Sequence, residues 1–517
     1  MRSITLDGES LNISTTVAVA DAWSRPEAIH IELSAKARDR MKASRAVVER
    51  LVDDGRIVYG ITTGFGAFKD RVIAPSETAE LQRNLLMSHS VGVGPALPEN
   101  TVRAMMLVRA NALAKGHSGI RLETVEALLE LLNRGVHPVV PAQGSVGSSG
   151  DLAPLAHMAL VLIGLGEAVY GGQRMSGAEA LRLAGLAPLS LQAKEGVALL
   201  NGTSLMTAIG CQALDRAGRL LQGADVAAAM SLEALKGTVL AFDARLHAAR
   251  PHPGQVACAG HLRGLLDGSE LIREASSTDV QDPYTLRCIP QVHGAVRDAV
   301  AQAGRVLLVE LNSATDNPLI FVDGPEGVAL SGGNFHGEPV ALVMDYMAVA
   351  LTDLGNMTER RIARLLDTAS NGGVLPPFLT RHGGLHSGLM MLQYTAAALA
   401  SENKVLAHPA SADSIPTSAN TEDHVSMGTI AARKALLVME HVETIVALEL
   451  LCAAQGVDFR RQDNPGLHLG KGTEPAYQAI RQRVPFIEAD TVMYPHIETL
   501  RNLVRGGLLT RAPVSGK

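Results

Sequence analysis

Apolar residues recur at intervals of three and four positions along most of this chain, and that spacing is the period of a helix with one buried face. The stretch from Ser204 to Thr238 is rich in alanine and leucine, holds no proline and would form one helix of about 50 Å. The same periodicity predicts helices over residues 33–53, 76–90, 99–114, 122–133, 204–238, 296–313, 336–368, 384–407 and 427–456.

The predicted fold class is mainly α. Long helices need partners along their length, and a long central helical bundle provides them. Short apolar stretches at 4–6 and 57–59 predict extended pieces, so we expect a small mixed N-terminal part over residues 1–115. Residues 116–517 then form the bundle part, and the two parts make one continuous unit. Ala-rich helices with long apolar faces also indicate an oligomer.

Composition narrows the classes of function. The chain has 517 residues, 47% of them hydrophobic, with 46 basic against 52 acidic side chains and no Lys/Arg-rich run. Nucleic acids and anionic membranes are therefore not expected partners. No apolar stretch has the length of a signal peptide or of a bilayer span, and the cysteines are far apart, so we expect a cytoplasmic protein with reduced thiols. These cysteines are Cys211, Cys258, Cys288 and Cys452.

The segment GSVGSSGDLAPLAH at residues 144–157 can turn the chain itself into an electrophile. If the Gly150 amide nitrogen attacks the Ser148 carbonyl carbon and water leaves, a five-membered imidazolone closes. Loss of the Ser149 hydroxyl as a second water then leaves an exocyclic methylidene. Ring closure needs a tight turn, which a residue without Cβ such as Gly150 permits.

The residues after this triplet predict a helix that would strengthen the electrophile. Asp151 suits an N-cap and Pro154 suits a first turn, so the helix begins close to residue 152 and its positive end faces the triplet. Taken alone, Ser-Ser-Gly is more typical of a glycine-rich loop that caps a buried helix.

Longer stretches decide between these interpretations. The segment at 144–157 resembles the signature of the histidine and phenylalanine ammonia-lyase family, whose usual triplet is Ala-Ser-Gly. The resemblance continues through nearly the whole chain, in YGITTGFG at 59–66, NGT at 201–203, QDPYTLRC at 281–288, GNFH at 333–336 and TSANTEDHVSM at 417–427.

The resemblance implies an ammonia-lyase/fumarase-like architecture and a homotetramer whose active sites are built from three subunits. It implies a 4-methylidene-imidazol-5-one formed from Ser148, Ser149 and Gly150, with no external cofactor. Ser88-His89 looks like the histidine-specific type. The expected reaction is therefore the elimination of ammonia from L-histidine to give urocanate, with a small-molecule amino acid as the only substrate.

The same resemblance assigns roles to individual side chains. Tyr59 is the base that takes the β-proton, with Tyr284 close to the ring, although the sequence does not show which tyrosine is the base. Arg287 would bind the substrate carboxylate bidentately. The remaining substrate-binding residues are Asn201 and Gln281 beside the ring, His89 and Glu422 for the imidazole, and Phe335 and Met390 against the ring of the substrate.

Two departures from the family pattern keep alternatives open. Ser148 replaces the usual alanine and Thr421 replaces a common glutamine, so maturation or substrate choice could change. A lyase or 2,3-aminomutase acting on phenylalanine or tyrosine is one alternative, and a non-catalytic homologue that does not cyclise because of Ser148 is another.

Histidine-containing segments raise the possibility of a metal site. His382 and His386 flank two glycines and a leucine, and Glu422 is followed closely by His424. The glycines argue against a helix that presents both histidines on one face, and no third ligand is evident. No metal is expected.

Overall fold

The computed structural model describes residues 2–274, 280–324, 326–507 and 509. The chain forms two compact units: unit 1 holds residues 1–215, 303–345 and 409–433, and unit 2 holds 216–302, 346–408 and 434–517. The predicted division at residue 115 differs from this one. The reason is that four long helices each contribute residues to both units, so that the chain passes repeatedly from one unit to the other.

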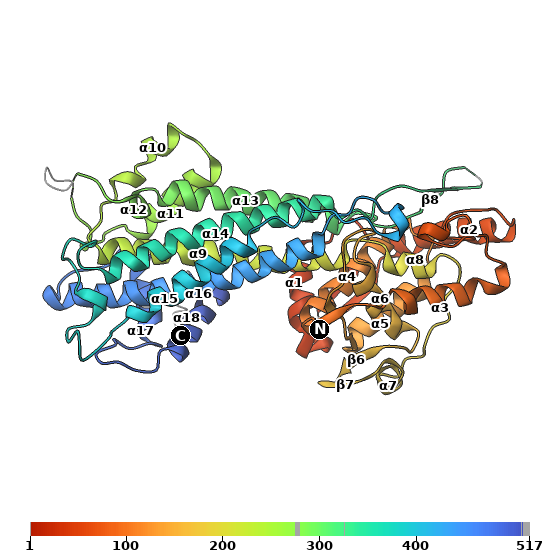
Figure 1. The fold of residues 1–517 in the computed structure, drawn as a ribbon, viewed down its shortest axis with the longest axis horizontal. Coiled ribbons are helices and arrows are strands. Elements are labelled where there is room, and N and C mark those ends of the chain that lie inside the picture. Colours follow the sequence, from red (N-terminus) through yellow and green to blue (C-terminus); the bar gives the residue numbers. More distant parts are fainter. Residues whose placement is uncertain (1, 275–279, 325, 508, 510–517) are drawn as a thin grey trace. The chain divides into compact units, whose positions relative to one another are not determined.

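Unit 1 combines shorter helices with small sheets, as Figure 1 shows at the red and orange end of the chain. Its elements are β1 (Arg2–Leu6), α1 (Ile13–Asp21), β2 (Ile29–Leu33), α2 (Ala35–Asp53), α3 (Thr78–His89), β3 (Val93–Ala96), α4 (Glu99–Ala114), α5 (Leu122–Arg134), β4 (His137–Pro138), β5 (Pro141–Gln143), α6 (Leu152–Leu162), β6 (Glu167–Tyr170), β7 (Gln173–Ser176), α7 (Gly177–Leu183), α8 (Glu195–Leu200), β8 (Leu319–Phe321) and β9 (Val328–Leu330).

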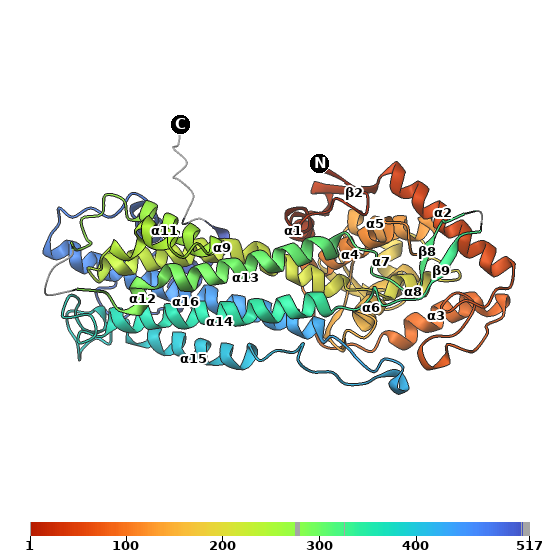
Figure 2. The same cartoon turned by 90° about the horizontal axis from the view of Figure 1, so that it is seen from above.

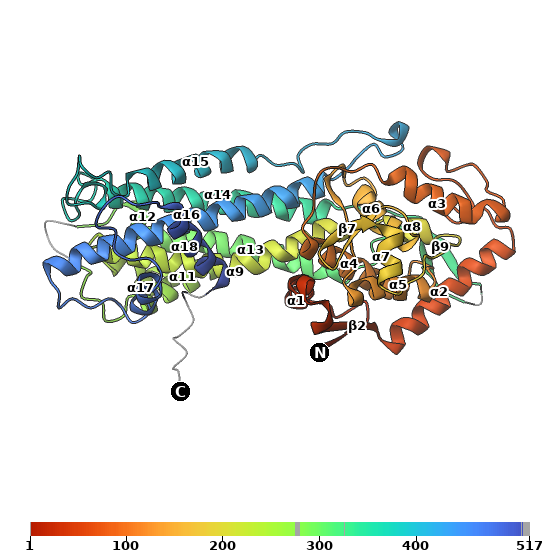
Figure 3. The ribbon, with the colours of Figure 1, turned by 90° about the horizontal axis from the view of Figure 1, so that it is seen from below.

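The strands of unit 1 form short, separate sheets. β1 pairs with β2 in parallel. The other three sheets are antiparallel: β3 pairs with β5, β6 lies between β4 and β7 and pairs with both, and β8 pairs with β9. Helices α3, α6 and α8 contact one another beside them (Figure 3). Their inward residues are apolar and fully buried, as for Leu86, Leu155 and Leu199. This packing fixes the loops that follow α8 and precede α6.

Unit 2 is helical among its described residues. It contains α10 (Ala244–Ala248), α11 (Pro253–Leu265), α12 (Tyr284–Arg287), α15 (Met390–Leu406), α17 (Thr473–Arg481) and α18 (Tyr494–Gly506). The four helices that contribute to both units are α9 (Ser204–Ala234), α13 (Ile289–Leu311), α14 (Glu338–Leu366) and α16 (Gly428–Asp463).

The unit 2 segments of these four helices lie side by side (Figure 2). Buried polar contacts join them: Glu449 of α16 accepts from Arg361 of α14 at 2.5 Å and from Ser231 of α9 at 2.7 Å. Asp225 of α9 accepts from His293 of α13 at 2.8 Å. A buried charge that loses its partner is destabilising, so these contacts fix the alignment of the helices within the bundle.

The mainly α fold class is confirmed, and the helix predicted over 99–114 coincides with α4. Two local predictions are wrong. Residues 57–59 form no strand, and the helix predicted to begin at 384 begins at Met390. The residues before Met390 cannot continue a helix, because Gly384 and Gly388 have φ values of +99° and +58°.

Helix α14 corrects a further expectation. By length and composition this helix of 29 residues is apolar enough to cross a bilayer, contrary to the prediction that no segment is. Its most apolar window is 67% buried inside the protein, which is the behaviour of a core helix.

Candidate active site

Three helices begin around the Ser148–Gly150 triplet. Helix α6 begins two residues after Gly150, and the N-termini of α9 and α16 are tied to the same point by Asp151. The Asp151 carboxylate accepts the backbone N–H of Leu205 at 2.8 Å and of Met206 at 3.1 Å, and its other oxygen accepts from the Thr429 hydroxyl. Three positive helix ends therefore surround the predicted electrophile.

Asp151 does not act as the sequence predicted. It occupies the N-cap position of α6 but makes no side-chain cap bond there, and it caps α9 instead. Complete burial of the Asp151 carboxyl raises its pKa, whereas these hydrogen bonds lower it. Burial has the larger effect, and the pKa is raised to about 6.

The backbone of the triplet is held by Gly202. Its N–H donates to the Ser149 carbonyl oxygen at 3.0 Å, and its carbonyl accepts from the Asp151 N–H at 2.8 Å. This short parallel bridge joins the Gly150 and Gly202 segments, which are far apart in the chain. The oxygen that would become the imidazolone oxygen is therefore already hydrogen-bonded.

The close approach of the two segments requires glycine on both sides. A Cβ on Gly150 would lie 2.1 Å from the Gly202 carbonyl oxygen, and a Cβ on Gly202 would lie 2.4 Å from the Thr315 carbonyl oxygen. Both glycines have positive φ, +79° and +132°. Gly150 and Gly202 thus form a close-packed cradle at the triplet, in which neither position has room for a Cβ.

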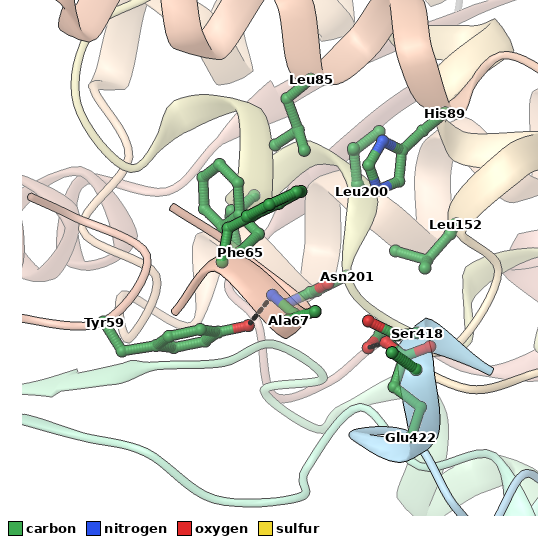
Figure 4. Close-up of a pocket in the computed structure, with 15 residues that line it drawn as sticks. Tyr59, Phe65, Ala67, Leu85, His89, Leu152, Leu200, Asn201, Ser418 and Glu422 are labelled. Carbon is green, nitrogen blue, oxygen red and sulfur yellow. Dashed lines mark hydrogen bonds between the residues drawn. The ribbon is translucent and has the colours of Figure 1, made fainter. Parts of the chain in front are cut away.

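Three cavities adjoin the triplet. The first, of about 380 Å³, and the second, of about 410 Å³, both reach Ser149, while Ser148 and Gly150 line a third of about 200 Å³. Figure 4 shows Tyr59 and Glu422 entering the first cavity from opposite sides, with His89 and the apolar side chains of Leu85 and Leu152 above them. These volumes suit a small, partly apolar molecule.

Glu422 is the charged side chain that lines all three cavities. One of its oxygens accepts from the Ser149 hydroxyl at 3.2 Å, and the other accepts from the Thr417 hydroxyl at 2.8 Å. Its carboxylate is thus fixed directly beside the predicted electrophilic position.

Tyr59 and His89 line the first cavity from the loop after α2 and from the end of α3. The Tyr59 hydroxyl accepts from the Gly66 N–H at 3.4 Å. The His89 Nδ1 lies 3.1 Å from the Ser88 hydroxyl, and burial lowers the pKa of the imidazole. His89 is therefore neutral at pH 7 and can accept or donate one hydrogen bond to a ligand.

Asn201 and Phe335 also lie at these cavities. The Asn201 carboxamide donates to the Asn317 carbonyl at 3.0 Å, so the donor directed at the Ser149 carbonyl oxygen is the backbone N–H of the following residue, Gly202. Phe335 and Thr421 line the second cavity.

Four predicted site residues belong to unit 2 instead. They are Gln281, Tyr284, Arg287 and Met390. The Tyr284 side chain is 69% exposed, and the Arg287 guanidinium lies over its ring at 4.5 Å from the ring centre. Tyr284 also lines a cavity of about 540 Å³ with Arg360 and Arg364.

The sequence reasoning missed several residues at the triplet. Phe65, Leu85, Leu152 and Leu200 supply the apolar wall of the first cavity, and Thr417 holds Glu422. Phe65 and Thr417 lie inside motifs that carry the family resemblance, so the sequence could have indicated that both residues are near the site. Gly202 stands next to Asn201, but a glycine after an asparagine is also typical of a simple turn.

Two groups of three potential metal ligands come together in the described part of the chain. Asp225, Cys258 and His293 form one in unit 2, and His336, Glu338 and His424 form the other in unit 1. In the first group Asp225 already pairs with Arg297 and accepts from His293 and His261, while burial raises the pKa of the Cys258 thiol. A protonated thiol and a neutralised carboxylate are poor metal ligands. The rings of His382 and His386 lie 6.4 Å apart.

Comparisons with known proteins agree over the full length of the chain. The model of the family described as "Aromatic amino acid lyase" matches residues 11–482. The histidine ammonia-lyase of Chloroflexus aurantiacus is 57% identical over 514 residues, which cover 99% of this chain and 98% of that protein.

Two solved structures extend the comparison. The histidine ammonia-lyase from Trypanosoma cruzi superposes with a TM-score of 0.89 at 44% identity, over 98% of this chain and 94% of that one. The tyrosine aminomutase from Streptomyces globisporus gives a TM-score of 0.91 at 38% identity, over 98% and 97% of the two chains.

Proposed function

The chain belongs to the aromatic amino acid lyase family, and from that premise we propose that it is an ammonia-lyase that converts L-histidine to urocanate and ammonia. The observation that carries the proposal is the cradle of Gly150 and Gly202, which surrounds a triplet able to cyclise and opens on cavities lined by His89 and Glu422. The full-length identity to histidine ammonia-lyases supports histidine as the substrate.

Ring formation uses atoms of the chain alone. The Gly150 nitrogen forms a bond to the Ser148 carbonyl carbon, and the Ser148 oxygen leaves as water with the amide hydrogens of Gly150 and Ser149. The Ser149 hydroxyl then leaves as a second water with the Ser149 α-hydrogen. The Gly202 N–H at 3.0 Å and the positive ends of three helices stabilise the Ser149 carbonyl oxygen throughout.

The resulting 4-methylidene-imidazol-5-one supplies an electrophilic carbon for the amine of the substrate. Tyr59, from the opposite side of the cavity to Glu422, is placed to take a β-proton. Glu422 accepts an imidazole N–H, and the neutral His89 completes the recognition of that ring. A phenyl ring offers no such donor, so it leaves the Glu422 oxygen on the Ser149 side without a partner, while Thr417 still binds the other oxygen.

We infer that the four predicted site residues of unit 2 reach an active site when subunits assemble. In our proposal a homotetramer brings Tyr284, Gln281, Arg287 and Met390 of neighbouring subunits to each triplet, and Arg287 binds the substrate carboxylate with its planar fork. Exposure of the Tyr284 and Gln281 side chains in the single chain supports this arrangement. We place the enzyme in the cytoplasm, and the free state of its four cysteines supports a reducing compartment.

Two measurements test the proposal. The intact mass of the purified chain should be lower than the sequence mass by two water molecules, and histidine alone among histidine, phenylalanine and tyrosine should give the absorbance of urocanate. A chain at full mass would support the non-catalytic alternative that Ser148 raises. Release of a β-amino acid would indicate a 2,3-aminomutase. This alternative is tested because the chain is structurally similar to a tyrosine aminomutase.

A further inference from the structure

A fully buried arginine lies beneath the Gly202 segment. Arg109 of α4 is 0% exposed, and its Nη1 donates to the carbonyl oxygen of Thr315 at 3.0 Å and to that of Asn201. One guanidinium nitrogen thus joins two chain segments that are more than a hundred positions apart. The second of these segments leads directly into Gly202.

The contact extends to Gly202 itself. A Cβ placed on Gly202 would lie 2.3 Å from the Arg109 Nη1. The guanidinium therefore packs directly against the α-carbon of the residue whose N–H and carbonyl hold Ser149 and Asp151. Removing this support would allow Gly202 to move away from the triplet.

The charges around Arg109 are not balanced. Lys194 pairs with Asp316 at 2.7 Å, both side chains are fully buried, and Asp316 is also the acidic group whose charge acts on Arg109. Two cations thus share one carboxylate, and burial lowers the pKa of Arg109 to about 10. A buried guanidinium remains charged at pH 7, so Arg109 is a cation beneath the Gly202 segment.

We propose that Arg109 is a positioning residue for ring formation, because it holds the Asn201–Gly202 segment against the Ser148–Gly150 triplet in the geometry that cyclisation needs. This inference rests on the proposed function, since it presupposes that the triplet dehydrates. Arg109 contacts neither the substrate cavities nor the triplet, and it acts through Gly202.

The same helix provides a matched control. Arg103 is also 0% exposed, and burial also lowers its pKa to about 10. Its guanidinium donates to the carbonyl oxygens of Val19 at 3.0 Å and Leu132 at 2.9 Å and lies 3.3 Å from the His137 Nε2. None of these residues belongs to the triplet or to the Asn201–Gly202 segment. A lysine at either position keeps the charge but loses the planar fork.

The experiment compares the wild-type chain with the Arg109→Lys and Arg103→Lys variants, each as the full-length assembly. Intact mass gives the fraction that has lost two waters at successive times after synthesis, and thermal unfolding followed by circular dichroism reports the fold. We expect Arg109→Lys to fold but to lose its waters about 10²-fold more slowly, whereas Arg103→Lys matures like the wild type despite a lower Tm. Gly202→Ala disturbs the contact between Gly202 and Arg109 from the Gly202 side. This variant should also keep the mass of the two waters for longer than the wild type.

Each outcome has a meaning. Equal maturation of the wild type and both lysine variants would overturn the role of Arg109 and leave the proposed function intact. Equally slow loss of water in both lysine variants would show that lower stability alone delays maturation, and it would also overturn the positioning role of Arg109. Failure of both Arg109→Lys and Gly202→Ala to fold would make the contact a requirement of the fold, which contradicts a positioning role. A wild-type chain that keeps both waters would refute this inference and the proposed function together.

Discussion

The Ser149 hydroxyl donates a hydrogen bond of 3.2 Å to the Glu422 carboxylate. The residue predicted to lose its hydroxyl and the residue predicted to read the imidazole are thus direct neighbours. Once the hydroxyl has left as water, this oxygen of Glu422 is free to accept from a ligand, while Thr417 still fixes the other oxygen at 2.8 Å. In the proposed mechanism, substrate recognition and ring formation therefore involve the same carboxylate.

Replacing Glu422 should relax the choice of substrate. We expect Glu422→Gln to mature normally but to lose about 10²-fold in kcat/KM for histidine, because the amide is a weaker acceptor for an imidazole N–H. Steady-state kinetics with histidine and phenylalanine measures the ratio. Thr417→Val is the matched control: it removes one hydrogen bond to the carboxylate and should cost about fivefold. An unchanged ratio in Glu422→Gln would remove Glu422 from specificity.

The two candidate tyrosines should differ in proton transfer. Tyr59→Phe should slow kcat by about 10²–10⁴-fold and abolish exchange of the β-hydrogen, since Tyr59 lines the cavity at Ser149. Exchange of β-deuterium with solvent is the direct measurement. Tyr284→Phe is the comparison, and we expect exchange to persist in it. The opposite pattern would make Tyr284 the base.

Ser148, which stands where the family usually has alanine, should not prevent ring formation. Ser148 contributes only its backbone to the ring, and its side chain borders the smallest of the three cavities, of about 200 Å³. We therefore expect Ser148→Ala to lose two waters as completely as the wild type, whereas Ser149→Ala cannot lose the second. Intact-mass measurement distinguishes them. A Ser148→Ala chain that matures while the wild type does not would identify Ser148 as the cause of an inactive homologue.

Asp151 should give the stability a characteristic dependence on pH. Burial raises the pKa of its carboxyl from 3.8 to about 6, so the native state binds the proton more tightly than the unfolded state does. Its stabilising contribution is complete below about pH 4 and is lost as the pH rises to about 6, with a fall in the unfolding free energy of about 3 kcal/mol.

The Asp151→Asn variant isolates this contribution. It cannot titrate, so the difference between its unfolding free energy and that of the wild type should change across the interval from about pH 4 to pH 6 and stay constant above it. Denaturant unfolding at several pH values supplies the numbers. A constant difference over the whole interval would mean that Asp151 keeps an ordinary pKa.

Local patterns in the sequence were sufficient for most helices. The apolar period over 99–114 depends on neighbours within two turns, and α4 has those limits. The extended piece predicted at 4–6 is confirmed as part of β1. Other short strands of unit 1 were missed because pieces such as β4, with two residues, carry no period at all. The start of α15 at Met390 depends on glycine backbone angles rather than on hydrophobicity.

The residues of the candidate site were likewise predictable only in part. Ser149, Tyr59, His89, Asn201 and Glu422 could be found in motifs, and the structure brings all of them to one cavity. The capping of α9 by Asp151 joins residues 54 positions apart, and the contact of Arg109 with Thr315 spans 206. Such pairings arise only from tertiary packing, since no local preference of Asp151 or Arg109 specifies the distant partner.

The convergence of α6, α9 and α16 on the triplet also sets when the electrophile can arise. The groups that hold Ser149 and the adjacent Asp151 come from Gly202, Leu205 and Thr429, so most of the polypeptide must have left the ribosome before they meet. In the proposed scheme, a nascent or misfolded chain therefore carries no electrophile that cellular amines and thiols can attack. Under this proposal, reactivity arises only in molecules that have already folded.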